Sequence, residues 1–232
     1  MAAIDASRLL RPGLLAGRCV LVAGGAGAAQ GSETVGGAVG SAFLRLGAEL
    51  AHFALSLDGS EQAQELACAE AVRDALSQMS RVDVLVMDGA AIFERAGARG
   101  AGEAGGDGAR EAGAAPERSA AQLGACVQAA WSVTRAVFTL AFEPHAGAGR
   151  IIYLAPPPGA GEHSGPARAG LENLARTLSI EWARHEVTAV TIAPGDGTAA
   201  EEIATLAAYL SSPAGAYFSG CLLDLRGPGG RR

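Results

Sequence analysis

The polar residues that could do chemistry gather on either side of position 160. His163 and Ser164 are adjacent, and a histidine titrates near neutral pH, so this pair could take part in proton transfer or nucleophilic catalysis. A hydrolase triad also needs a third group that orients the histidine, and no residue is positioned for that role. Glu162 and Tyr153 are the other nearby candidates. The Gly/Pro-rich turn favours an exposed loop histidine at 163, and the apolar run around Tyr153 favours a packed or interfacial tyrosine.

Two elements must position these residues. Residues 150–155 form an apolar, β-branched run short enough for a buried strand, and prolines 156–158 end it because proline has no N–H for a ladder. Ser164 then has the character of a helix N-cap, with Pro166 in the first turn. Apolar residues follow at spacings of three or four and predict one apolar stripe on a helix: Ala167, Leu171, Leu174, Leu178 and Trp182.

The segment Gly149–Ala183 resembles the active-site segment of the short-chain dehydrogenase/reductase family, in which a strand ends near a catalytic serine and a helix opens with Tyr-x-x-x-Lys. The stretch ARAGLENLARTLSIEWA is close to that helix. Here the tyrosine position falls on Ser164, the lysine position on Arg168 and the serine position on Pro156. The family's proton-relay asparagine falls near Cys126. The resemblance extends over nearly the whole chain and implies an α/β fold, a Rossmann-type doubly wound parallel sheet.

All four catalytic roles implied by the resemblance are altered. Ketone reduction needs an acid that protonates the developing alkoxide, and in the family the tyrosine does this beside the lysine. The hydroxyl of Ser164 is too weak an acid and too short to replace it. Arg168 keeps the charge but not the compact geometry of an ammonium group, and Pro156 has no hydroxyl. We therefore expect no catalytic residues at these positions.

A glycine-rich stretch follows the predicted strand Cys19–Ala23. Such a turn lets the backbone approach a pyrophosphate, with the next helix N-terminus facing the negative charge. The family pattern Thr-Gly-x-x-x-Gly-x-Gly has a degenerate counterpart here in a longer loop, where a threonine replaces one glycine. The candidate cofactor-binding positions in this loop are Gly24, Gly25, Gly27, Thr34 and Gly36.

Other cofactor positions also depart from the family. The ribose-binding acid falls on Ala54, and the family's Asn-Asn-Ala-Gly places Asp88 beside the cofactor's own negative charge. Pro194 and Gly195 match the family's Pro-Gly after its sixth strand. On these grounds we expect the chain to have no cofactor, and NAD(P) only if it is an active enzyme. The sequence leaves open whether it is an enzyme.

The length of 232 residues suits one α/β domain. We expect an N-terminal arm at 1–17, a single Rossmann-type domain at 18–228 and a tail at 229–232. Residues 96–119 are Gly/Ala-rich and predict a flexible surface insertion. Between Ala54 and Asp83 there is room for one helix, where the family has two helices and a strand. We therefore predict about six strands with helices on both faces, and the family's substrate-covering segment also looks deleted.

Composition excludes several classes of function. A net charge of −6 argues against a nucleic-acid partner, and no apolar run approaches the ~20 residues of a membrane span. The first residues do not resemble a secretory signal. The four cysteines have no metal-ligating or paired spacing, so we expect no metal and reduced thiols in a cytoplasmic protein: Cys19, Cys68, Cys126 and Cys221.

The segment Leu123–Phe142 predicts a helix that is apolar nearly all round and needs cover on both sides. The sheet can cover one side, and a neighbouring subunit is expected on the other. The resembled family commonly pairs this helix and the Gly149–Ala183 helix across a dimer interface. The expected interface residues are Trp131, Phe138, Leu171, Leu174, Leu178 and Trp182.

These features lead to one main functional hypothesis. The chain would be a catalytically inactive subunit, a pseudoenzyme, that supports or regulates an active paralogue in a hetero-oligomeric oxidoreductase. One alternative is an active NAD(P)-dependent oxidoreductase with a rearranged site. Another is a homodimer, or a tetramer, that binds a small ligand in the vacated cleft.

Overall fold

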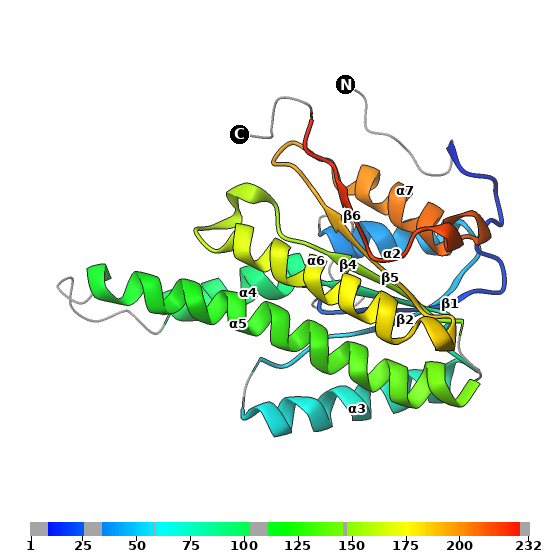
Figure 1. The fold of residues 1–232 in the computed structure, drawn as a ribbon, viewed down its shortest axis with the longest axis horizontal. Coiled ribbons are helices and arrows are strands. Elements are labelled where there is room, and N and C mark those ends of the chain that lie inside the picture. The colour runs from blue at the N-terminus through cyan, green and yellow to red at the C-terminus, as the bar shows by residue number, and fades with distance from the viewer. Residues whose placement is uncertain (1–8, 26–33, 58, 103–110, 146–147, 228–232) are drawn as a thin grey trace.

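The computed structural model describes residues 9–25, 34–57, 59–102, 111–145 and 148–227, with only the backbone of 100–102 and 111–119. Its centre is a parallel six-stranded sheet of order β2-β1-β3-β4-β5-β6 (Figure 1). The strands are β1 (Cys19–Ala23), β2 (Glu49–Phe53), β3 (Val84–Asp88), β4 (Arg150–Leu154), β5 (Thr188–Ala193) and β6 (Cys221–Asp224). The predicted strand number and parallel arrangement are confirmed.

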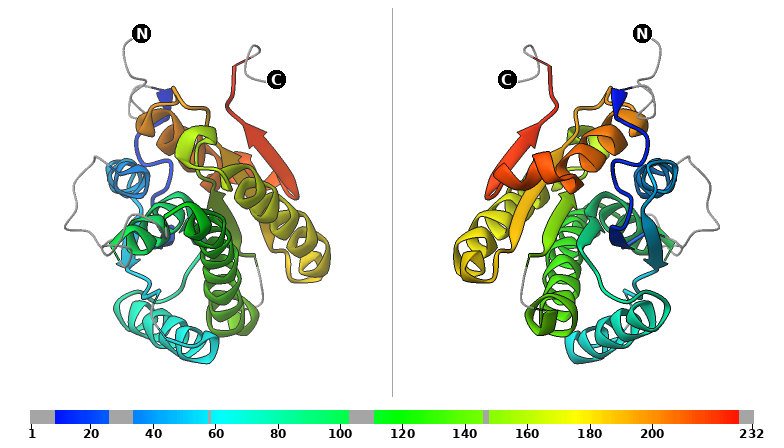
Figure 2. Two further views of the ribbon diagram at one scale, coloured as in Figure 1. Left: turned by 90° about the vertical axis from the view of Figure 1, so that its left-hand side faces the viewer. Right: turned by 90° about the vertical axis from the view of Figure 1, so that its right-hand side faces the viewer.

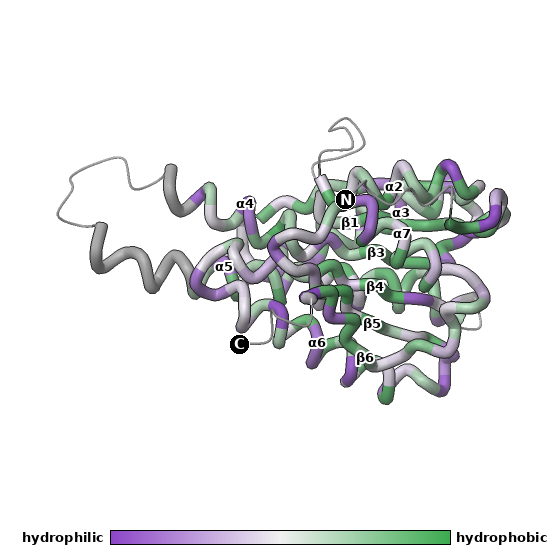
Figure 3. Tube along the Cα trace, turned by 90° about the horizontal axis from the view of Figure 1, so that it is seen from above, coloured by the Kyte–Doolittle hydropathy of each residue, from purple (hydrophilic) through white to green (hydrophobic). Residues whose placement is uncertain are grey.

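Helices cover both faces of the sheet. Helices α2 (Val35–Arg45) and α7 (Ala200–Ser211) lie on one face, and α3 (Glu61–Gln78), α5 (Glu111–Val137) and α6 (Ser164–Glu181) lie on the other (Figure 2). Helix α4 (Gly89–Gly102) packs against α5. Successive side chains of β1 alternate between the two apolar layers, as the pleat of a strand requires. The central strands are mostly hydrophobic (Figure 3), which suits a sheet buried on both faces.

The two expected deletions are present. Only α3 separates β2 from β3, and a short loop at 194–199 joins β5 to α7. This loop is too short to cover the carboxyl ends of the central strands, as the family's longer substrate-covering segment would.

Two local predictions were wrong. Residues 96–102 belong to α4 and residues 111–119 to α5, so these parts of the expected loop are helical, while 103–110 lie outside the described residues. Alanine favours a helix strongly enough to offset the glycines there. Ser164 is the first residue of α6 rather than its cap, because its hydroxyl donates to the Pro158 carbonyl instead of accepting from the helix.

The second face of α5 is covered within the chain. Helix α3 packs along it, and the two helices are joined by Arg135 Nη2 and Glu65 Oε2 at 3.0 Å and by Gln128 Nε2 and Glu61 Oε1 at 2.8 Å. The apolar surround of this helix therefore does not by itself require a partner. Residues 120–142 are long and apolar enough for a membrane span by length and composition alone, but most of this stretch is buried in the core.

Half of the expected interface residues belong to the chain's own core. Leu171 and Leu178 are fully buried beneath α6, and the Phe138 ring stacks on Trp182 with ring centroids 4.0 Å apart. Leu171, Leu178 and Phe138 are thus inaccessible to a second subunit, which corrects that part of the prediction. Trp131, Leu174 and Trp182 are only partly buried and keep some exposed surface.

Candidate functional site

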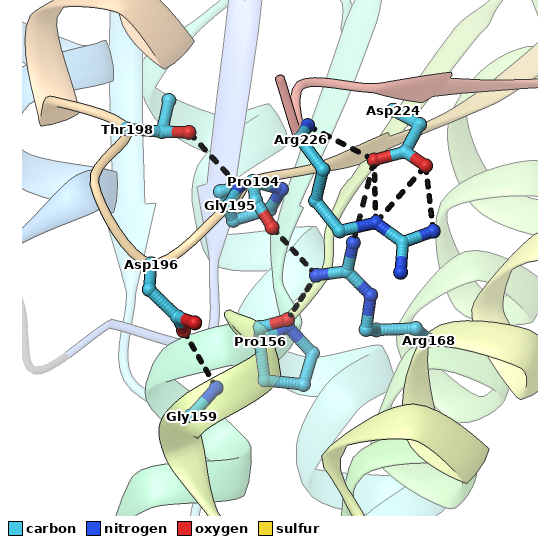
Figure 4. Close-up of polar contacts among 9 residues, drawn as sticks. All are labelled: Pro156, Gly159, Arg168, Pro194, Gly195, Asp196, Thr198, Asp224 and Arg226. Atoms are coloured by element: carbon cyan, nitrogen blue, oxygen red, sulfur yellow. Dashed lines mark hydrogen bonds and ion pairs between the residues drawn. The ribbon is translucent and has the colours of Figure 1, made fainter. Parts of the chain in front are cut away.

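The candidate site lies at the carboxyl ends of the strands, where open α/β sheets bind ligands. Pro156 follows β4, Pro194 follows β5, and Asp224 is the last residue of β6. Helix α6 lays the side chain of Arg168 across these three strand ends (Figure 4). The strand order brings them together, because β4, β5 and β6 are consecutive neighbours in the sheet.

Arg168 links the carboxyl ends of β4 and β5 by hydrogen bonds. Its Nη1 donates to the carbonyl of Pro156 at 2.8 Å and to the carbonyl of Pro194 at 2.7 Å. Its Nη2 lies 3.8 Å from Asp224 Oδ1 and makes no hydrogen bond within the described part of the chain. The residue is 8% exposed, and burial lowers the pKa of its guanidinium, which nevertheless stays charged at physiological pH. The cation is therefore engaged by backbone oxygens.

Asp224 is shared between two arginines. The guanidinium of Arg226 donates to both carboxylate oxygens, from Nε at 2.9 and 3.0 Å and from Nη2 at 2.6 Å (Figure 4). These hydrogen bonds hold the pKa of Asp224 at about 2. Asp224 is consequently an anion at neutral pH that orders Arg226 and faces Arg168. Sequence reasoning missed both Asp224 and Arg226, because only the position of β6 in the sheet reveals their closeness to Arg168.

The remaining catalytic positions are also engaged by the backbone. Ser164 Oγ donates to the Pro158 carbonyl at 2.6 Å, and Cys126 Sγ donates to the Gly89 carbonyl at 3.4 Å. Burial raises the pKa of the Cys126 thiol to about 12, so it is protonated at neutral pH. The structure brings Pro156 and Arg168 into contact, and it places no carboxyl, phenol or imidazole in hydrogen-bond contact with Arg168 among the described residues.

The other candidate acids do not replace the missing tyrosine. Tyr153 is fully buried in β4, and its hydroxyl pairs with Thr134 Oγ1 at 2.9 Å. Burial raises the pKa of this phenol above its usual value. His163 is partly exposed before α6, and Glu162 is exposed beside it. A separate aspartate, Asp196, accepts a hydrogen bond from the Gly159 amide at 2.7 Å and fixes the loop between β4 and α6.

The turn after β1 begins at a position that requires glycine. Gly24 has φ +107°, and a Cβ at this position would lie 2.8 Å from the Asp88 carbonyl oxygen, so only glycine fits without a shift. Thr34 caps α2 by accepting a hydrogen bond from the Gly37 amide at 3.1 Å. Gly25 is described, whereas Gly27 lies outside the described residues.

Asp88 joins the beginnings of two helices. It is 1% exposed, its Oδ2 accepts from the Gly36 amide at 3.0 Å, and its Oδ1 accepts from the Ala91 amide at 3.0 Å. The carboxyl thus occupies one of the α2 amides that would otherwise face a phosphate. Burial raises the pKa of Asp88, so the structure favours the neutral carboxylic acid more than water does.

Arg95 is a further residue that sequence reasoning missed. Its Nη1 donates to the Gly24 carbonyl at 3.0 Å and its Nη2 to the Leu55 carbonyl at 2.6 Å. It thereby ties the ends of β1 and β2 together. Ala54, at the expected ribose position, is exposed and offers no carboxylate. No sequence motif marks Arg95, because its role depends on α4 crossing these two strand ends.

Comparisons with known proteins address the fold. Neither a protein-family model nor a curated protein sequence matches the chain. Solved structures do match over almost its whole length. A short-chain dehydrogenase/reductase of Burkholderia xenovorans aligns with a TM-score of 0.71 and 20% identity, over 93% of this chain and 97% of its own.

Two further structures agree. A short chain dehydrogenase from Mycobacterium smegmatis has a TM-score of 0.69 and 18% identity, over 98% of this chain and 97% of its own. The hydroxysteroid dehydrogenase of Escherichia coli has a TM-score of 0.65 and 19% identity, over 94% and 99%. The chain has the short-chain dehydrogenase/reductase fold. The resemblance of Gly149–Ala183 to that family's active-site segment thus reflects a shared three-dimensional fold.

These matches overturn the expectation of no cofactor. The matched proteins are dehydrogenases and reductases, a class that works with NAD(P), so the altered motif residues do not justify excluding it. The short-chain dehydrogenase/reductase fold of this chain retains the glycine-only turn at Gly24 and the capped N-terminus of α2. Our prediction gave too much weight to single positions and too little to this backbone geometry.

The described residues are compatible with a dinucleotide at this turn. The Gly24 amide donates to the Phe53 carbonyl and the Gly36 amide to Asp88, so the phosphates would be held by the Gly25 amide and the Thr34 hydroxyl. The nicotinamide would supply hydride-transfer chemistry. Asp88 opposes the phosphate charge only while its carboxyl is ionised, and its raised pKa makes a proton there easier to hold. The Pro194 carbonyl accepts a hydrogen bond from Arg168. The Gly195 amide donates to Thr198 Oγ1 at 2.9 Å.

Proposed function

We propose that this chain is a non-catalytic subunit built on the short-chain dehydrogenase/reductase fold, which supports or regulates an active paralogue in a hetero-oligomeric oxidoreductase of the cytoplasm. The proposal concerns the chemical step and leaves NAD(P) as a ligand that the scaffold could hold. We also propose that the chain is a member of the short-chain dehydrogenase/reductase family. The shared fold supports this membership, and so do the family motifs that the sequence keeps in altered form.

One observation carries the proposal. The cation at the family's lysine position is held by the carbonyls of Pro156 and Pro194, and the residue at its tyrosine position, Ser164, is held by Pro158. Ketone reduction needs a proton donor of suitable pKa within hydrogen-bond reach of the alkoxide. A serine hydroxyl bound to a carbonyl and a buried arginine supply neither the proton nor the tuned acidity. The arrangement therefore favours a structural role for these residues.

A partner could dock on the outer face formed by α5 and α6. Trp131 and Leu174 are partly buried there, on the two helices that the resembled family uses for pairing. A tryptophan with exposed surface is a common anchor in protein interfaces. The alternative, a small-ligand-binding homodimer, would use the same helices with a second copy of the chain.

The other alternative is an active oxidoreductase with a rearranged site. The matched dehydrogenases favour it, because their fold is that of this chain. It would require an acid other than Ser164, and Tyr153 is already paired with Thr134 inside the core. We therefore place it second.

Assembly is tested by Trp131→Glu and Leu174→Glu. After co-expression with an active paralogue, each variant should lower the yield of complex at least about tenfold, because a charge would be buried in an apolar contact. Leu66→Glu is the matched control, since Leu66 is 59% exposed and belongs to α3 rather than to α5 or α6. The measurement is complex mass by sedimentation. Equal complex formation by all three variants would remove this interface, and a monomer at every concentration would favour the ligand-binding or enzymatic alternatives.

A further inference from the structure

A cavity lies at the amino-terminal edge of the sheet, opposite the candidate functional site. Its volume is about 500 Å³, which is within the range of small-molecule sites. Arg18 lines it just before β1, Arg150 is the first residue of β4, and Thr188 is the first residue of β5. None of these residues takes part in the site described above.

Two arginines line this cavity, Arg18 and Arg150. The pKa of Arg150 is lowered by burial and by repulsion between its guanidinium group and that of Arg18. Arg18 lies 4.0 Å from Asp83, which is already bound more closely by Arg81 at 2.8 Å. Arg150 forms no ion pair in the parts of the chain that the structure describes. An anion between the two arginines would relieve this repulsion.

Several hydrogen-bond donors of the residues that line the cavity are not used by the described part of the protein. Arg150 Nη1 is fixed by the carbonyls of Leu210 and Ser212, and these bonds leave its Nε and Nη2 without a protein acceptor among the described residues. The hydroxyls of Thr188 and Ser219, which also line the cavity, make no side-chain hydrogen bond in that same part of the protein. The lining carries one acid, Glu186, against two arginines.

The backbone around the cavity is strained. Ala148 has φ 59° and Glu186 has φ 56°, and they are the only non-glycine residues with positive φ in the described ranges. Both line this cavity, and the Ala148 amide donates to the His185 carbonyl at 2.9 Å. Such conformations are unfavourable for residues with a Cβ and persist where the surroundings enforce them, often at ligand sites.

We propose that this cavity binds a small phosphomonoester. The phosphate would lie between Arg18 and Arg150, since the planar guanidinium matches two phosphate oxygens at once. Thr188 and Ser219 would donate to the remaining oxygens. The cavity is larger than a phosphate ion needs, and its apolar lining, which includes Ala183 and Ala216, would contact the organic part.

Calorimetric titration of the full-length protein with phenyl phosphate, in a phosphate-free buffer, tests the site. We expect saturable binding that weakens at high salt and is at least about tenfold weaker in Arg18→Gln, which loses a charged donor but keeps the Arg150 contacts. Arg18→Lys should be intermediate and serves if Arg18→Gln does not fold. Arg73→Gln is the matched control, because Arg73 is exposed on α3 and outside the cavity lining.

Each outcome bears on the proposal. Binding of phenyl phosphate that exceeds that of inorganic phosphate, with loss in Arg18→Gln only, supports it. Equal binding of the two ligands supports the phosphate position and overturns the contact with the organic part. Absence of binding, equal affinity in Arg18→Gln, or equal binding of phenol overturns the site. These results are independent of whether the chain is catalytic.

Discussion

Replacement of Arg168 by methionine is expected to lower the free energy of unfolding by about 2–4 kcal/mol, because the variant leaves the buried carbonyls of Pro156 and Pro194 without a donor. Asp224 stays paired with Arg226, so no unpaired carboxylate adds to the loss. The desolvation of the guanidinium, which is relieved in the variant, offsets part of the cost. Urea denaturation followed by circular dichroism measures the change.

Arg176→Met is the control for Arg168→Met. Arg176 lies on the same helix, its side chain is 62% exposed, and its one ion pair among the described residues is with Glu172 at 2.8 Å. Its loss should cost no more than about 0.5 kcal/mol, as for other exposed pairs of this spacing. An Arg168→Met protein as stable as the wild type would contradict the structural role of Arg168 and would free this cation for substrate or cofactor contacts.

Phe138→Ala is expected to destabilise the fold by about 3–5 kcal/mol, because a large ring is removed from a packed core. The ring is 9% exposed and stacks on Trp182 within the same chain. Tyr217→Ala, at a ring that is 92% exposed, should leave stability within about 0.5 kcal/mol of the wild type. Thermal and urea unfolding are the measurements.

Phe138→Ala also separates two locations for this ring. If Phe138 faced a second subunit, as the sequence predicted, the variant would keep its stability as a monomer and lose association instead. Sedimentation of the folded variant at several concentrations makes the distinction. A stable Phe138→Ala protein with weakened assembly would show that the core position assigned here is wrong.

Much of the fold follows from local sequence patterns. Short apolar runs such as Cys19–Ala23 and 150–155 predicted buried parallel strands, and the short chain length between Ala54 and Asp83 predicted the missing strand. The 96–119 segment was misread because low complexity does not exclude helix in an alanine-rich stretch. The cover of α5 was misread because a one-dimensional apolar pattern cannot tell whether α3 or a second subunit packs against it.

The candidate site was less predictable. Alignment to the family located Ser164 and Arg168, but not the partners that fix them, because those partners are backbone carbonyls or come from distant strands. Asp224 lies near Arg168 because β4, β5 and β6 are neighbours in the sheet. Asp88, at the end of β3, accepts a hydrogen bond from Gly36 at the start of α2. The expectation of no cofactor relied too much on side-chain identity. The shape of the dinucleotide-binding turn depends on its backbone conformation, which few side chains reveal.

Hydride transfer is the most direct test of a non-catalytic role for these positions. The full-length protein is incubated with NADH and NADPH deuterated on either face of C4 and with a metabolite extract, so that no substrate has to be guessed, and products are analysed by mass spectrometry. Heat-denatured protein is the control, and an active short-chain dehydrogenase/reductase confirms that the extract contains reducible substrates. We predict no protein-dependent transfer of deuterium. Deuterium in any product that requires the folded chain would contradict the account and establish the active-oxidoreductase alternative.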